Sequence, residues 1–206
     1  MDSSGNRNTG TITGATWTSG KLGKGLSFDK SSDYVEIGNN IKIDNSHIGT
    51  ITAWAKATTD KNGGGRVFNY GGSSQFGTGN YLGLTLTGTA AFFIYNDDPF
   101  LSNSISIASL TKGVWHHIAV VSEGSEYFMY VDGVARSFSV SGNNDGAWFA
   151  DVTAVSPVMT TIGVERSDGN FYNLFKGLID DVRIYKRALT AAEILLYQSG
   201  AATIKQ

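Results

Sequence analysis

The chain has 206 residues, a formal net charge of −2 at pH 7 and only 17% charged side chains. This balance gives no electrostatic basis for binding nucleic acid or an anionic membrane surface. No apolar run is long enough to cross a bilayer, so we expect a soluble protein without membrane insertion. The N-terminus has neither the basic start nor the apolar stretch of a signal peptide.

The use of glycine, proline and cysteine narrows the class of protein further. Twenty-six glycines against two prolines, without a repeating period, indicate many tight turns. Cysteine is absent, which excludes disulfides and thiolate metal sites but does not decide the compartment. The 41% hydrophobic share is enough for a core, and the length suits one all-β unit. We therefore expect residues 1–206 to form a single domain.

Alternation of apolar and polar residues with a period of two recurs along the chain and predicts β-strands. In chain order, the expected strands are 26–29, 34–37, 49–56, 66–70, 81–86, 91–95, 115–121, 127–131, 135–140, 160–164 and 178–185. Residues 141–156 form the longest expected loop. About twelve short strands at this spacing predict two packed antiparallel sheets.

One helix is expected, close to the C-terminus. Thr190-Ala191-Ala192-Glu193 has the pattern of a capping box, in which the Thr190 hydroxyl binds the Glu193 amide and Glu193 reaches back. The helix is predicted over residues 191–198.

Five motifs along the chain occur in the order that is typical of a known family. They are Ser27-Phe28-Asp29, Ile51-Thr52-Ala53-Trp54, Trp115-His116-His117-Ile118-Ala119, Tyr130-Val131-Asp132-Gly133 and Ile179-Asp180-Asp181-Val182-Arg183-Ile184-Tyr185. Together they resemble the laminin-G-like branch of the concanavalin A-like lectin/glucanase superfamily. The resemblance implies an all-β fold: a two-sheet antiparallel jelly-roll sandwich with one short C-terminal helix. It also implies sugar binding without catalysis.

The start of the chain departs from the family pattern. The family has a strand before the loop that residues 2–6 resemble, whereas this chain begins at that loop. We therefore expect a trimmed domain that was excised from a larger protein. Loss of an edge strand would leave backbone groups unpaired, and a partner or residues 201–206 would cover them.

Catalysis is not expected. Glycoside hydrolases use two carboxylates that face each other across a cleft, and the glucanases of the superfamily carry them as Glu-x-Asp-x-Glu on one strand. The chain lacks this pattern. His116 and His117 lie on one expected strand and point to opposite faces, so one of them is expected to be a hydrogen-bonded core histidine. A glycosidase or lyase with an unfamiliar site is the less favoured alternative.

The resemblance further implies a structural calcium ion between the first hairpin and the last strand. Calcium binds hard oxygen ligands, and the matching positions are Asp29 and Asp180, with Asp33 and Asp181 nearby. The alternative is that Asp180 caps a turn by accepting hydrogen bonds from backbone N–H groups.

Sugar recognition combines aromatic faces with polar groups that bind hydroxyls. Aromatic residues within expected strands, Trp54 among them, are assigned to the core, and aromatic residues in loops are candidates for binding. Trp148 and Tyr172 are expected to stack on sugar rings. The polar candidates for the hydroxyls are Arg166, Asp97 and Asn170.

Each of two candidates also has a structural alternative. Trp148 could anchor its loop on the edge of the sandwich. Arg166 could form a surface ion pair with Glu165 or Asp168, which would contribute little to stability.

These observations predict a non-catalytic carbohydrate-binding module that tethers a larger secreted or surface protein to a glycan, and therefore an extracellular location. The alternative is a protein-interaction or structural module of a surface or phage assembly.

Overall fold

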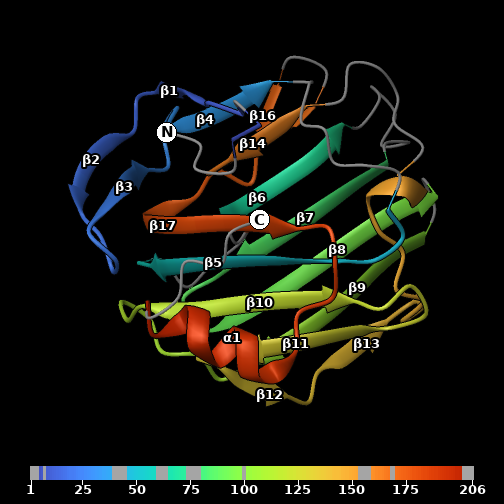
Figure 1. Ribbon diagram of the computed structural model, residues 1–206. Coiled ribbons are helices and arrows are strands. Elements are labelled where there is room, and N and C mark those ends of the chain that lie inside the picture. The colour runs from blue at the N-terminus through green and yellow to red at the C-terminus, as the bar shows by residue number, and fades with distance from the viewer. Residues whose placement is uncertain are drawn as a thin grey trace.

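The computed structural model describes residues 5–6, 8–38, 46–58, 65–72, 80–98, 101–152, 159–167 and 170–200. Within them the chain forms two large antiparallel sheets, a separate hairpin and one short helix. Figure 1 shows the two large sheets as face-to-face layers. The predicted jelly-roll sandwich is confirmed.

The larger layer is an eight-stranded sheet in the order β1-β4-β14-β6-β7-β8-β9-β13. Its strands are β1 (Thr11–Thr13), β4 (Tyr34–Gly38), β14 (Thr160–Ile162), β6 (Gly65–Gly72), β7 (Asn80–Leu86), β8 (Ala90–Asp98), β9 (Leu101–Ala108) and β13 (Ser139–Ser141). The strands β6 to β9 form an antiparallel meander at its centre.

The second layer is a seven-stranded sheet in the order β12-β11-β10-β5-β17-β3-β2. Its strands are β12 (Val134–Arg136), β11 (Tyr127–Val131), β10 (His116–Ser122), β5 (Gly49–Ala57), β17 (Lys176–Tyr185), β3 (Lys24–Asp29) and β2 (Thr16–Ser19). The two central strands β5 and β17 pair along nearly their whole length, with a bulge between Asp180 and Arg183.

The main core lies between the two sheets, because successive side chains of a strand point to opposite faces and the apolar ones face inward. Buried side chains that contribute to it include Phe28, Ile51, Phe68, Leu84, Phe93, Ile105, Ile118 and Met129. The 3-10 turn η1 (Phe149–Asp151) adds Trp148 and Phe149 to this core.

The helix α1 (Ala191–Gln198) packs on the outer face of the seven-stranded sheet, near β10 and β11 (Figure 1). Ile194 and Tyr197 of α1 are buried there against Ala119 and Val121. The predicted capping box is confirmed, since the Glu193 amide donates to the Thr190 hydroxyl at 3.3 Å and the Thr190 amide donates to the Glu193 carboxylate at 2.9 Å.

The structure also contains strands that the sequence pattern does not predict. These are β1, β2 and β9, together with the hairpin β15 (Glu165–Ser167) and β16 (Asn170–Tyr172). β1 and β2 are edge strands of the two sheets. Residues 201–206, which were expected to cover an open edge, lie outside the described residues. No helix in the described part of the chain has the length and apolarity needed to span a membrane.

Candidate glycan-binding site

The β15–β16 hairpin stands on the outer face of the eight-stranded sheet. The chain leaves β14 at Gly163, whose φ of +85° lies in the left-handed region that glycine favours. It returns at Phe175, whose amide donates to the Gly163 carbonyl at 2.8 Å. Gly163 also lies close to the Phe28 ring, because a Cβ added there would come within 2.3 Å of it. A glycine turn therefore starts the excursion that forms the hairpin.

One side of the hairpin is held to β6 by Arg66, which is fully buried. Its Nε and Nη2 donate to the Glu165 carboxylate at 3.0 and 2.6 Å, and its Nη1 donates to the Thr85 hydroxyl at 2.6 Å. The same guanidinium lies 4.9 Å from the centre of the Tyr81 ring, and burial raises the pKa of Tyr81. These interactions satisfy the Arg66 charge and fix the base of the hairpin.

The other side of the hairpin faces β4. Arg166 donates from Nη1 to the Glu36 carboxylate, and the Phe171 ring lies 5.1 Å from the Tyr34 ring. Arg166 and Phe171 are cross-strand partners, and the guanidinium lies 5.5 Å from the centre of the Phe171 ring. Arg166 therefore pairs with Glu36 and not with Glu165, while Asp168, the other partner named in the structural alternative, lies outside the described residues.

A pocket of about 330 Å³ opens beside these contacts. We call it the β4 groove, and it is lined by Thr9, Thr11, Thr13, Tyr34, Glu36 and Ile37. Thr11 pairs with Glu36 and Thr13 pairs with Tyr34, so these four side chains share the outer face of the sheet. Through Glu36 and Tyr34, the groove adjoins the hairpin.

The groove presents chemistry that suits a polyhydroxylated ligand. Threonine hydroxyls both donate and accept, the Glu36 carboxylate accepts, and the Arg166 guanidinium donates. Arg166 and Glu36 keep 25% and 33% of their side chains exposed, and the buried Nε of Arg166 has no acceptor among the described residues. The half-exposed ring of Phe171 adds an apolar surface next to these polar groups. The arrangement therefore offers hydroxyl, carboxylate, guanidinium and aromatic groups to one ligand.

Three of the five predicted sugar-binding residues lie on the hairpin. Arg166 borders the β4 groove, whereas Tyr172 follows Phe171 on β16 and its side chain points to the opposite face of the hairpin. Tyr172 is 49% exposed and Asn170 is exposed as well. Their predicted contacts with sugar remain predictions. Asp97 belongs to β8, but its side chain lies outside the described residues.

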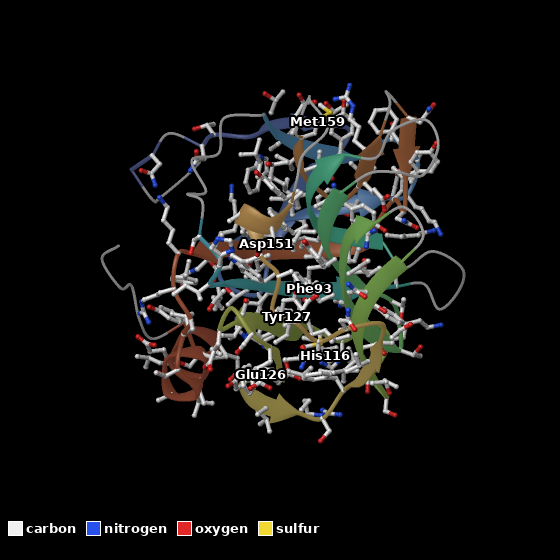
Figure 2. The ribbon with its side chains drawn as sticks, turned by 90° about the vertical axis from the view of Figure 1, so that its right-hand side faces the viewer. Phe93, His116, Glu126, Tyr127, Asp151 and Met159 are labelled. Atoms are coloured by element: carbon white, nitrogen blue, oxygen red, sulfur yellow. The ribbon has the colours of Figure 1, made fainter. Side chains whose placement is uncertain are left out.

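The prediction that Trp148 stacks on a sugar ring is wrong. Trp148 is 1% exposed, lies 5.8 Å from Phe93 in a stacked arrangement and contacts Phe149 edge-on. Figure 2 shows Phe93 and Tyr127 near the middle of the molecule, where this aromatic cluster fills the core. A large apolar ring in a loop is buried here because the loop folds back between the two sheets.

Asp29 and Asp180 do not form the predicted shared calcium site. Lys176 pairs with Asp29 and Ile179 pairs with Leu26, so Asp180 lies four residues from the end of β3 that carries Asp29. Four residues of strand span roughly 13 Å, which is too far for one ion. Asp29 binds Ser31 instead, and these hydrogen bonds lower its pKa. Calcium held by other oxygens stays a prediction.

Asp180 follows the alternative given for it. Its carboxylate accepts a hydrogen bond from the Leu22 amide at 2.8 Å and thereby holds the turn between β2 and β3. The described residues contain no group of three or more histidine or acidic side chains that could hold a metal ion.

The two adjacent histidines point to opposite faces, as predicted. His116 Nδ1 lies 2.9 Å from the Asp132 carboxylate, which makes it a hydrogen-bonded structural histidine. His117 is buried on the outer face of the seven-stranded sheet beside Trp54, and burial lowers its pKa to about 4.

Sequence reasoning missed most of the β4 groove. Thr9, Thr11 and Thr13 alternate with period two and could have indicated a strand with one polar face. Glu36 and Tyr34 were read only as part of a hairpin strand, and Phe171 only as part of a loop. No local signal indicates that these segments meet.

The comparisons with known proteins agree with this architecture. The family model described as the concanavalin A-like lectin/glucanases superfamily matches residues 29–195. The chain belongs to this superfamily. No curated protein matches the chain.

Solved structures with the same fold include two with bound oligosaccharide. Domain 4 of AbnA, a GH43 extracellular arabinanase from Geobacillus stearothermophilus in complex with arabinotriose, is 21% identical with a TM-score of 0.66. That match covers 94% of this chain and 90% of the domain. The CBM40 of the Ruminococcus gnavus IT-sialidase bound to α2,3-sialyllactose is 17% identical with a TM-score of 0.65, covering 91% and 98%. At such identities the likeness shows the fold.

Proposed function

We propose that this chain is a non-catalytic carbohydrate-binding module that holds a glycan in the β4 groove. One observation carries the proposal: a pocket lined by hydroxyls and the Glu36 carboxylate adjoins the guanidinium of Arg166 and the half-exposed ring of Phe171. An aromatic ring suits the C–H face of a sugar, and the polar groups suit its hydroxyls. The oligosaccharides bound to the two solved modules support this class of ligand.

The mode of binding follows from the shape and chemistry of the groove. The ligand would lie along β1, where Thr11 and Thr13 meet its hydroxyls, with one ring against Phe171. Arg166 and Glu36 already bind each other, so they are held in position before the ligand arrives. Because the pocket is small and open to solvent, affinity at a single site would be weak. Attachment to a larger secreted or surface protein would then increase binding through multivalency.

The experiment is affinity electrophoresis against a panel of plant, algal and microbial polysaccharides. The protein should be retarded by at least one polysaccharide without releasing reducing sugar from it. Phe171→Ala and Thr11→Val should each reduce the retardation, because the first removes the ring and the second removes a hydroxyl with little change in shape.

Tyr172→Ala is the matched comparison, since Tyr172 is a similarly exposed aromatic residue on the opposite face of the hairpin. Loss of retardation in Tyr172→Ala, but not in Phe171→Ala, would place the ligand on the other face and contradict the groove. Release of reducing sugar would contradict the non-catalytic assignment.

A protein-interaction module is the second candidate, and one surface favours it. Val134 of β12 and Leu195 and Leu196 of α1 are exposed apolar side chains. Leu195 also lies near Gly133, where an added Cβ would come within 2.7 Å of its side chain. Val134→Thr with Leu195→Ser should abolish capture of such a partner while leaving glycan retardation unchanged.

Calcium is a separate proposal, in which Asp29 or Asp180 would bind an ion together with other oxygen ligands and not with each other. The melting temperature should be measured with calcium and with chelator in Asp29→Ala and Asp180→Asn separately. A calcium-dependent rise that one variant removes would identify the ligand, whereas identical melting curves would contradict binding.

A further inference from the structure

The outer face of the seven-stranded sheet carries a tryptophan and a histidine that belong to neither apolar core. Trp54 of β5 and His117 of β10 are cross-strand partners, with ring centroids 5.3 Å apart. Their neighbours Ala53, Ala55 and Ile118 point into the core between the sheets, so Trp54 and His117 point away from it. The assignment of Trp54 to that core is therefore wrong, although the residue is buried.

Both side chains hold a buried nitrogen atom that has no hydrogen-bond partner in the described part of the chain. Trp54 is 3% exposed and His117 is 2% exposed, and neither Trp54 Nε1 nor His117 Nδ1 bonds to any described residue. The indole nitrogen can only donate, whereas one nitrogen of a neutral imidazole accepts. Unsatisfied buried polar atoms are uncommon because each one destabilises the folded chain. When Nε2 of His117 carries the proton, Nδ1 is an acceptor beside the indole donor, and a hydroxyl group can bind both.

The turn between β2 and β3 lies over the Trp54 ring of this pair. Lys21 at its tip places Nζ 4.7 Å from the centre of the Trp54 ring, and the Leu22 amide donates to Asp180. Gly20 allows this close approach, because a Cβ added there would lie 2.4 Å from the Asp180 carboxylate. The turn itself is closed by a hydrogen bond from the Gly20 amide to the Gly23 carbonyl at 2.9 Å.

We propose that the β2–β3 turn is a movable cover over a second saccharide site, separate from the β4 groove. When the turn lifts, the face of the Trp54 ring becomes free of Lys21 and the Asp180 carboxylate becomes free of Leu22. The opened surface then offers an aromatic face, a carboxylate, an indole donor and the imidazole of His117. An aromatic face with a few polar groups around it suits a hydroxylated sugar ring.

The cover weakens binding in a predictable way. A ligand that binds only the open form must compete with closure of the turn. Its apparent affinity equals its affinity for the open form multiplied by the fraction of molecules that are open. Replacing Lys21 by serine removes the side chain that lies over the Trp54 ring, and replacing Leu22 by serine removes the side chain that packs the turn close to Gly200, so the turn should lift more readily while Trp54, His117 and Asp180 stay unchanged. This double variant should bind sugar more tightly than the parent protein.

The test uses the indole N–H signals of ¹⁵N-labelled protein, with the Trp54 signal assigned by its loss in Trp54→Phe. The parent is Arg166→Ala, so that the β4 groove does not contribute. Arabinotriose, 3′-sialyllactose and maltotriose are each titrated into this parent and into the same protein with Lys21→Ser and Leu22→Ser. We expect at least one sugar to shift the Trp54 signal saturably, with several-fold higher affinity in the cover variant. The Trp148 signal should not move, because that ring is in the core.

The proposal would be overturned if none of the three sugars shifted the Trp54 signal in the cover variant. Quenching of fluorescence by acrylamide gives a second measurement that needs no sugar. The fluorescence of Trp54 is obtained by subtracting the spectrum of the matching Trp54→Phe protein. Acrylamide should quench this fluorescence more strongly in the cover variant than in the parent. Equal quenching in the two proteins would show that the turn is not a cover and would also overturn the proposal.

Discussion

Glu165 and Arg166 are consecutive residues of β15, and their side chains bind oppositely charged partners on opposite sides of the hairpin. Glu165 accepts hydrogen bonds from the buried Arg66, whereas Arg166 donates to the half-exposed Glu36. The first pair fixes the hairpin to the sheet, and the second borders the β4 groove. The two pairs should therefore respond differently to mutation.

Glu165→Ala should strongly destabilise the protein. The change leaves the buried Arg66 guanidinium without its carboxylate, and removing one partner of a buried ion pair costs about 3–5 kcal/mol. The free energy of unfolding in urea measures the effect. Glu126→Ala is the control, because Glu126 is exposed in a hairpin tip and its loss should cost less than about 0.5 kcal/mol. Equal losses in the two variants would contradict the anchoring role of Glu165.

Trp148→Ala should lower the free energy of unfolding by about 3–5 kcal/mol, because it leaves a cavity among buried aromatic rings. Chemical denaturation followed by circular dichroism measures the change. Tyr172→Ala, on the exposed hairpin, should change stability by no more than about 0.5 kcal/mol. If Trp148→Ala abolished glycan binding without loss of stability, its place in the core would be contradicted.

Stability should fall as the pH is lowered from about 6.5 to about 4 because of His117. In the unfolded chain a histidine takes up its proton near pH 6.5, but burial lowers the pKa of His117 in the folded protein to about 4. Between these pH values the unfolded state binds more protons than the folded state, so the free energy of unfolding falls by up to about 3 kcal/mol. The urea midpoint of the wild type, compared across this window with that of His117→Phe, measures the effect. The same pH dependence in both proteins would refute the assignment.

Thr190→Ala should destabilise α1 and its packing on the sheet by about 1 kcal/mol, because the Glu193 amide loses its cap. Thr190→Ser keeps the hydroxyl and is the matched control. Thermal melting distinguishes the two variants. An Ala variant as stable as the Ser variant would show that the capping box is dispensable. In that case the contact between Arg187 and Glu193 would be enough to hold the start of the helix.

Local patterns predicted the parts of the fold that depend on local physics. The capping box at Thr190 and Glu193 located α1, and alternation in 49–56 located the central strand β5. The same patterns did not reveal the short strands β15 and β16, because three residues are too few to show a period. The two histidines of β10 were placed correctly on opposite faces, since that follows from strand geometry alone.

By itself, the sequence determined the sandwich, its helix and the superfamily, because the alternation and the order of the motifs are written along the chain. Only the tertiary structure decided which aromatic rings are exposed to a ligand and which are buried. Trp148 in a loop is buried, Phe171 in a short strand is half-exposed, and Trp54 faces outward beneath a turn. The reason is physical: burial depends on which segments, distant in sequence, pack over a residue, and strand periodicity does not encode that.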